Sequence, residues 1–245
     1  MHDSHIMMSG PMVLACLRQV RGEPGGKTQT RRMPTKQWDA LERRFLAGES
    51  LRLWVRESGR TLSEPYDCDP VSGRDEWRIA GFQHAADGAL VSFRKYDVPL
   101  NEWIGDTSDK STPSIHMPRW ASRLTLLDVT IRRERLGDIS EADARAEGIA
   151  WQDPTADDLE WYRGYCEEHF IDAERNPMEG VWIVPGIQRP QPLGGIWGPT
   201  AASAYSFLWR HLYGWDSWER DADKEVMVIG FRPVLANIDQ IGGAP

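Results

Sequence analysis

The segment KTQTRR, from Lys27 to Arg32, contains the first residues that could do chemistry. A threonine hydroxyl becomes a nucleophile only when a base removes its proton. Lys27 could be that base if burial or the neighbouring cations Arg31 and Arg32 favour its neutral form. In an extended segment, Thr28, Thr30 and Arg32 would share one face. The alternative is a polar turn or short strand with solvated cations, and the residue types alone favour this alternative.

Glu147 is a second candidate, because its carboxylate lies in the last turn of a helix predicted over residues 140–147. Ser140 and Asp143 have the spacing of a capping box at the start of this helix, and Gly148 supplies a left-handed stop. A carboxylate at this end faces the negative end of the helix dipole. Such local conflicts are more frequent at functional sites, although a solvated glutamate there needs no explanation.

A third candidate is the segment SIHMPRWASR, which holds His116, Arg119, Trp120 and Arg123 within a short stretch. An arginine and a tryptophan can hold a nucleobase by hydrogen bonding and stacking. The alternative is a loop that Trp120 anchors to the protein body. The sequence favours neither interpretation.

Two other kinds of site are not expected. The segment GEPGGKT differs from a phosphate-binding loop, because that motif needs glycine where Arg21 stands, and Gly22 is one residue too late. The scattered cysteines and histidines offer neither a disulfide framework nor a metal site. We therefore expect no metal or other cofactor. The cysteines are Cys16, Cys68 and Cys166.

The elements that must position these residues follow from the hydrophobic periodicity. Alternating apolar residues predict strands, and capped segments with apolar residues at helical spacing predict helices between them. The predicted strands begin at Leu51, Ser122 and Glu225, with weaker candidates at WRIAGF and ALVSFRKY; the predicted helices are PMVLACLRQV, ISEADARAEG, LEWYRGYCEEHF after Thr155 and Asp158, and Thr200 to Gly214.

The length of 245 residues favours one large domain, over residues 11–235, with a surface insertion at about 151–199. We expect residues 1–10 to be a tail or cloning scar and residues 236–245 to be a loose tail. A mean hydropathy of -0.53 and the lack of a long apolar run predict no membrane span. Unpaired cysteines and the lack of a signal peptide predict a cytoplasmic location.

The net charge of -8 argues against a protein that coats nucleic acid by bulk electrostatics. The charge is uneven, however. Residues 1–60 hold 11 basic and 6 acidic side chains, a net charge of +5, and the remainder has a net charge of -13. Residues 137–179 alone hold 13 acids and 3 bases. Residues 1–60 are therefore the expected binding region for an anion, and residues 137–179 are a possible protein-docking surface.

Several motifs taken together resemble the ASCH domain family of the PUA-like group, in the form carried by bacteriophages and prophages. The resemblance covers about residues 11–150 and 200–233, and its most specific elements are KTQTRR and ISEADARAEGI occurring together. It implies an α+β fold, with a small β-barrel, flanking helices and a cleft for RNA, nucleosides or modified bases. The other motifs are PMVLACL, GESLRLWVRE, PSIHMPRWASRLTL and FLWRHLYGWDSWERDADKEVMVIGFRP.

One branch of this family comprises N4-acetylcytidine amidohydrolases, whose site is described as a Thr, Lys and Glu triad with a basic neighbour. Matching K-T-x-T-x-R onto this chain implies Lys27 and Thr30 as catalytic residues and Arg32 as the neighbour. The family glutamate falls on Glu147. The chain departs from the family in its GEPGG turn, its greater length and the 151–199 insertion, which put the substrate in doubt more than the fold.

Three hypotheses follow. As an enzyme, Lys27 would take the proton of Thr30, which attacks an acylated cytosine nucleoside, and Glu147 would protonate the leaving amine. As a binding module, the same cleft would bind a nucleoside, a modified base or short single-stranded RNA without hydrolysis. As a phage accessory protein, it would act through protein contacts. The expected substrate-binding residues are Thr28, Arg31, Arg32, Trp54, His116, Arg119 and Trp120.

Overall fold

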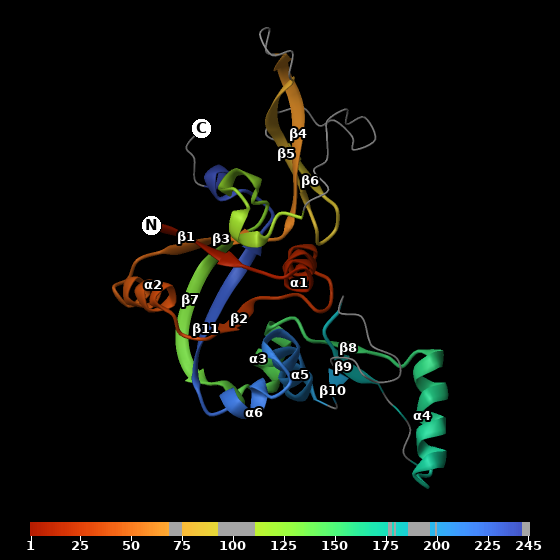
Figure 1. Cartoon of the computed structure of the whole chain (residues 1–245). Coiled ribbons are helices and arrows are strands. Elements are labelled where there is room, and N and C mark those ends of the chain that lie inside the picture. Colours follow the sequence, from red (N-terminus) through yellow and green to blue (C-terminus); the bar gives the residue numbers. More distant parts are fainter. Residues whose placement is uncertain are drawn as a thin grey trace. The chain divides into compact units, whose positions relative to one another are not determined.

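The protein is a mixed α/β molecule that divides into two compact units of interleaved chain segments (Figure 1). Unit 1 comprises residues 1–17, 43–129 and 231–245, and unit 2 comprises residues 18–42 and 130–230. Neither unit is one continuous stretch of the chain, and the single domain expected over residues 11–235 stays a prediction. The computed structural model describes residues 1–68, 75–92, 111–175, 178, 180–185, 197–198 and 200–241.

The largest sheet has five strands in the order β1-β3-β7-β11-β2. Strand β1 is parallel to β3, whereas β3 is antiparallel to β7 and β11 is antiparallel to β2. Because β1 and β2 are the two edges of this sheet, it stays open, and no sheet among the described residues closes into the expected barrel. The bounds are β1 (His2–Met7), β2 (Gln29–Arg32), β3 (Leu51–Arg56), β7 (Thr125–Arg135) and β11 (Glu225–Val234).

Each unit also holds a small antiparallel sheet of three strands. The sheet in unit 1 has the order β4-β5-β6, and the sheet in unit 2 has the order β10-β9-β8. In Figure 1, β4 and β5 form a long twisted ribbon. The bounds are β4 (Gly59–Cys68), β5 (Asp75–His84), β6 (Leu90–Ser92), β8 (Ala150–Gln152), β9 (Val181–Ile183) and β10 (Trp197–Gly198).

The core of unit 1 follows the predicted periodicities. Helix α1 (Gly10–Arg21) buries Val13 and Leu17, and alternate residues of β3 point into the core. The expected N-terminal tail instead forms β1, because residues 2–7 pair along their whole length with β3 and bury Ile6. The expected C-terminal tail includes the short helix η5 (Ile238–Gln240), whose Ile238 is fully buried. Two further short helices are η2 (Ser114–His116) and η3 (Arg119–Ala121).

Unit 2 contains β2, residues 225–230 of β11 and the helices α3 to α6. The cap of α3 is confirmed, since the Ser140 hydroxyl accepts a hydrogen bond from the Asp143 amide. The start of α4 at Thr155 and the end of α5 at Gly214 are confirmed too. The expected insertion contains α4, β9 and β10, and several of its residues lie outside the described part. The bounds are α2 (Lys36–Leu46), of which residues 36–42 belong to unit 2, η4 (Leu136–Asp138), α3 (Glu141–Ala146), α4 (Ala156–Glu168), α5 (Ala201–Tyr213) and α6 (Ser217–Asp221).

None of the helices that the structure describes has the length and apolar character needed to cross a membrane.

Candidate functional site

Lys27 and Glu147, which are 120 residues apart in the chain, form a buried ion pair in unit 2. The Lys27 ammonium donates to Glu147 Oε2 at 2.6 Å and to the backbone carbonyl of Glu147 at 2.9 Å. The backbone amide of Thr28 donates to the carbonyl of Ala146. The segment before β2 therefore caps the C-terminal end of α3, where cations and donors are favoured. This cap also accounts for the carboxylate of Glu147 at the unfavourable end of its helix.

Arg31 supplies the second cation beside Glu147. Its Nη1 donates to Glu147 Oε1 at 3.2 Å, and its Nε donates to Glu134 at 3.1 Å. A third carboxylate, Asp143, lies 3.4 Å from Nη2. Burial by itself lowers the pKa of Arg31, but Glu147 and Glu134 outweigh it and raise this pKa above its ordinary value. Arg31 is thus held by carboxylates rather than presented to solvent.

The cations of this site are matched by an equal number of acids. Arg132 lies between Glu134, at 3.1 Å, and Asp143, at 2.9 Å. Burial raises the pKa of Asp143, but the hydrogen bond from Ser140 and the nearby arginines lower it further than burial raises it. We call the six residues the charge network: Lys27, Arg31, Arg132, Glu134, Asp143 and Glu147.

Thr30, the expected nucleophile, lies in β2 opposite Ile229 of β11. Its side chain is buried. Neighbouring residues of a strand point to opposite faces of the sheet. The Thr30 side chain therefore lies on the face opposite to the one on which Arg31 contacts its carboxylate partners. Among the described residues, the Lys27 ammonium donates its two hydrogen bonds to Glu147. Thr28 and Arg32, which flank this strand position, are partly exposed.

Tyr205 of α5 is a neighbour of the charge network that the sequence did not single out. The guanidinium carbon of Arg31 lies 5.7 Å from the centroid of its ring. Burial, followed by the charge of Glu147, raises the pKa of Tyr205 well above its ordinary value, so the phenol stays protonated. The only signal in the sequence was its place on the apolar face of a predicted helix, where a core role is the default.

The other expected substrate-binding residues belong to unit 1. The rings of Trp54 and His5 are tilted against each other, with 5.6 Å between their centroids, and the Arg56 guanidinium lies 5.3 Å from the centroid of the Trp54 ring. Arg119 is paired with Asp239 at 2.7 Å and with Asp3 at 2.8 Å. His116 is exposed.

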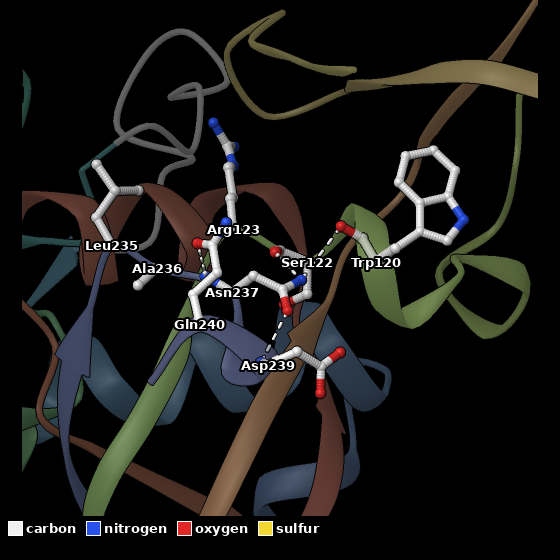
Figure 2. A pocket seen from close by; sticks show the side chains of 8 residues that line it. All are labelled: Trp120, Ser122, Arg123, Leu235, Ala236, Asn237, Asp239 and Gln240. Atoms are coloured by element: carbon white, nitrogen blue, oxygen red, sulfur yellow. Dashed lines mark hydrogen bonds between the residues drawn. The ribbon is translucent and has the colours of Figure 1, made fainter. Parts of the chain in front are cut away.

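Trp120 lines a pocket of about 440 Å³ in unit 1. Figure 2 shows its indole ring directed away from the Asn237 amide, which instead donates to the backbone carbonyls of Trp120 and Ser122. The Asn237 oxygen accepts from the Asp239 amide. The polar centre of this pocket is therefore occupied by the protein's own hydrogen bonds. Sequence reasoning did not find this pocket, because half of its lining comes from the expected C-terminal tail.

Unit 1 also holds a buried cluster of charged groups. His84 Nδ1 lies 3.0 Å from Glu57 Oε1, and both residues are almost completely buried. Arg123 donates to both oxygens of Glu57, at 2.9 and 3.0 Å, and to Asp87 at 2.8 Å. These contacts join the end of β3, the end of β5 and the segment before β7. The cluster anchors the three-stranded sheet of unit 1 to the rest of that unit.

Among the described residues, no group of three or more histidine, cysteine, aspartate or glutamate side chains has the arrangement of a metal site. Comparison of the chain with protein-family models, characterised proteins and solved structures found no match.

Proposed function

We propose that the chain is an ASCH-type protein of the PUA-like group, and that unit 2 binds an acylated cytosine nucleoside and hydrolyses its amide. The single observation that carries this proposal is the 2.6 Å contact between Lys27 and Glu147. The resemblance names these two residues as partners, and they meet although the sequence separates them widely. The resemblance also supports a cytoplasmic location, in the host cell if the chain is phage-encoded.

The proposed reaction uses the short Lys27 to Glu147 contact for proton transfer. Lys27 passes a proton to Glu147 and, as a neutral amine, takes the proton of the Thr30 hydroxyl. The Thr30 oxygen attacks the acyl carbon, and the bond from this carbon to the exocyclic nitrogen breaks. Glu147 returns its proton to the leaving nitrogen. Water then hydrolyses the threonyl ester, which restores the Thr30 hydroxyl and releases the acid.

The test is to incubate the purified protein with N4-acetylcytidine and to follow cytidine by liquid chromatography. We expect turnover by the wild type and a loss of about 100-fold or more in Thr30→Val and Glu147→Gln, because each removes a group that transfers a proton or forms the intermediate. Arg232→Ala, which changes an exposed ion pair of unit 1, serves as the control.

Circular dichroism of each variant separates lost chemistry from lost folding. The proposal fails if the wild type shows no turnover, or if Lys27→Ala folds and keeps the wild-type rate.

The second candidate function is binding of RNA or a modified base without hydrolysis. The position of Thr30 favours it, because Thr30 points away from the strand face of Arg31, and both oxygens of Glu147 already have partners. Binding to a nucleic-acid strand weakens as salt rises, whereas hydrolysis of a neutral nucleoside does not respond. A salt series for both readouts therefore distinguishes the two functions. A protein-docking role for residues 137–179 stays a prediction.

A further inference from the structure

A second pocket of unit 1, of about 460 Å³, lies beside the buried cluster of charged groups in that unit. Its wall comes from the start of β4, from the end of β5 with the turn that follows, and from Ser111. Gly59, Ala85 and Gly88 contribute at most a methyl group each, which leaves space between the larger side chains of the wall. A volume of this size is in the range of small-molecule sites.

His84 joins this pocket to the charged cluster, because it belongs to both. Its Nδ1 lies 3.0 Å from Glu57 Oε1, and a carboxylate can only accept hydrogen bonds, so Nδ1 carries a proton. Arg123 holds both oxygens of Glu57, and the Phe82 ring meets the imidazole edge to face, with 5.1 Å between centroids. The imidazole is therefore held in one orientation, with Nε2 on the side of the ring away from Glu57.

The Nε2 atom of His84 is the unsatisfied group of this site. Among the residues that the structure describes it has no hydrogen-bond partner, although the side chain has no exposed surface. A buried polar atom without a partner is unfavourable, and a ligand atom would remove this penalty. Contact requires a side chain of the wall to turn aside. Gln83 is suited to this, because the hydrogen bond that holds its amide to the Gly88 carbonyl is long, at 3.4 Å, and weak.

The charges around His84 indicate the charge of the ligand. Glu57 and Asp87 contribute two negative charges, and Arg123, which pairs with both, contributes one positive charge. An imidazole protonated on both nitrogens makes this cluster neutral, and Arg60 in the pocket wall adds one positive charge. None of the described residues that line the pocket is acidic. A ligand with one negative charge therefore balances the site, whereas a phosphate monoester, at about -1.5 to -2, exceeds it.

We propose that this pocket binds a small organic carboxylate, which accepts a hydrogen bond from His84 Nε2 and pairs with the Arg60 guanidinium. Arg60 is exposed, and a planar guanidinium fits a carboxylate with two parallel hydrogen bonds. Glu57 is a positioning residue, because it holds the imidazole through Nδ1 and does not contact the ligand. The site lies in unit 1, so the proposal is independent of the hydrolysis proposed for unit 2.

Titration of the nitrogen-15-labelled protein with acetate, followed by the NMR signals of the histidine ring nitrogens, tests the proposal. Sodium chloride keeps the ionic strength constant, acetamide is the uncharged probe of similar shape, and inorganic phosphate is the alternative anion. We expect acetate to shift the His84 Nε2 signal saturably, with a dissociation constant on the order of millimolar. Acetamide should cause no shift, and phosphate should bind more weakly. The exposed His116 is the internal control, and its signals should not respond.

Two variants separate binding from folding. Arg60→Gln removes the exposed cation and should weaken acetate binding about three- to tenfold, the range for one lost hydrogen bond. Arg232→Gln, which removes another exposed arginine of unit 1 outside the pocket, is the matched control. His84→Asn keeps a donor near the position of Nδ1 but removes Nε2, and it should abolish binding, with circular dichroism reporting its fold. If this variant does not fold, the comparison of Arg60→Gln with Arg232→Gln still decides.

Three results would overturn the proposal. Without a saturable shift by acetate, water alone satisfies Nε2. Equal binding of acetamide and acetate, or equal acetate affinity in the wild type and Arg60→Gln, removes the role of charge. Tighter binding of phosphate than of acetate contradicts the carboxylate. Hydrolysis of N4-acetylcytidine is measured separately, so its failure does not affect this proposal.

Discussion

Lys27 is a charged residue with no exposed surface, and its contacts explain how the fold tolerates it. Its ammonium pairs with the Glu147 carboxylate and also donates to the Glu147 backbone carbonyl at the C-terminal end of α3. The sequence indicated that Lys27 and Glu147 were unusual, because one lies in a basic run and the other opposes its helix dipole. It could not indicate that Arg31 shares the same carboxylate, since strand alternation only sorts residues onto faces and does not say what covers each face.

Replacement of Lys27 by Met should reveal the energetic coupling of this pair. The variant leaves Glu147 with only one cation, and we expect a loss of about 3 kcal/mol in the free energy of unfolding. The double variant Lys27→Met with Glu147→Leu should recover at least about half of this loss, because no uncompensated carboxylate remains. Urea unfolding followed by tryptophan fluorescence measures both. Equal losses in the single and double variants would show that the pair is not coupled.

Glu57 should contribute to the acid sensitivity of unit 1. Burial raises the pKa of Glu57, but His84 and Arg123 lower it further, and the net result is below the ordinary value of 4.5. A depressed folded pKa gives stability that is present above about pH 4.5 and is lost as the pH falls through the folded pKa. Glu57→Gln should therefore lower the free energy of unfolding at neutral pH. In this variant the urea midpoint, measured as a function of pH, should fall less steeply below about pH 4.5 than in the wild type. Glu49→Gln, in an exposed ion pair, should keep the wild-type slope.

At the scale of elements, local signals were reliable where a residue's own chemistry starts or ends a helix. Ser140, Thr155 and Gly214 lie at the predicted boundaries. The sequence did not predict β1, because an edge strand that pairs on one side needs little hydrophobic periodicity of its own. It did not predict α2, because this helix is rich in charged residues. Their formation depends on partners that are distant in sequence, such as β3 for β1.

Two glycines should respond oppositely to substitution by alanine. A Cβ at Gly59, the first residue of β4, would lie against the carbonyl oxygen of Gln83 and the ring of Phe82, closer than atoms can approach. We expect Gly59→Ala to lose about 1–3 kcal/mol from overpacking. Gly164 of α4 has open space around its Cβ position, so Gly164→Ala should gain about 0.5–1 kcal/mol from helix propensity. Thermal unfolding checks both, and a stable Gly59→Ala variant would contradict the close packing.

At the scale of the whole molecule, the sequence correctly indicated a mixed α/β protein but not its division into two units. The charge counts along the chain suggested that the basic residues 1–60 and the acidic remainder would form separate surfaces. The structure brings basic and acidic residues from these two parts together, as in the charge network. Averages along the chain could not reveal this, because charge pairing depends on which residues the fold brings into contact.

We therefore expect no general affinity for nucleic acid. The net charge is -8, and Lys27 and Arg31 are already paired with Glu147, so these two cations are not available to displace counterions from a long polyanion. A gel-shift assay with a long single-stranded RNA at about 0.15 M salt should show no retarded band at micromolar protein. A shift that disappears when Arg31 is replaced would contradict this and would support the RNA-binding alternative.

The interleaving of the two units sets a constraint on the order of events during synthesis. Unit 1 needs residues 231–241, which the ribosome delivers only after every residue of unit 2 has been made. During translation of unit 2, the core of residues 43–129 therefore lacks the part that residues 231–241 contribute. The fold of residues 43–129 is therefore completed by residues that are translated about a hundred positions later.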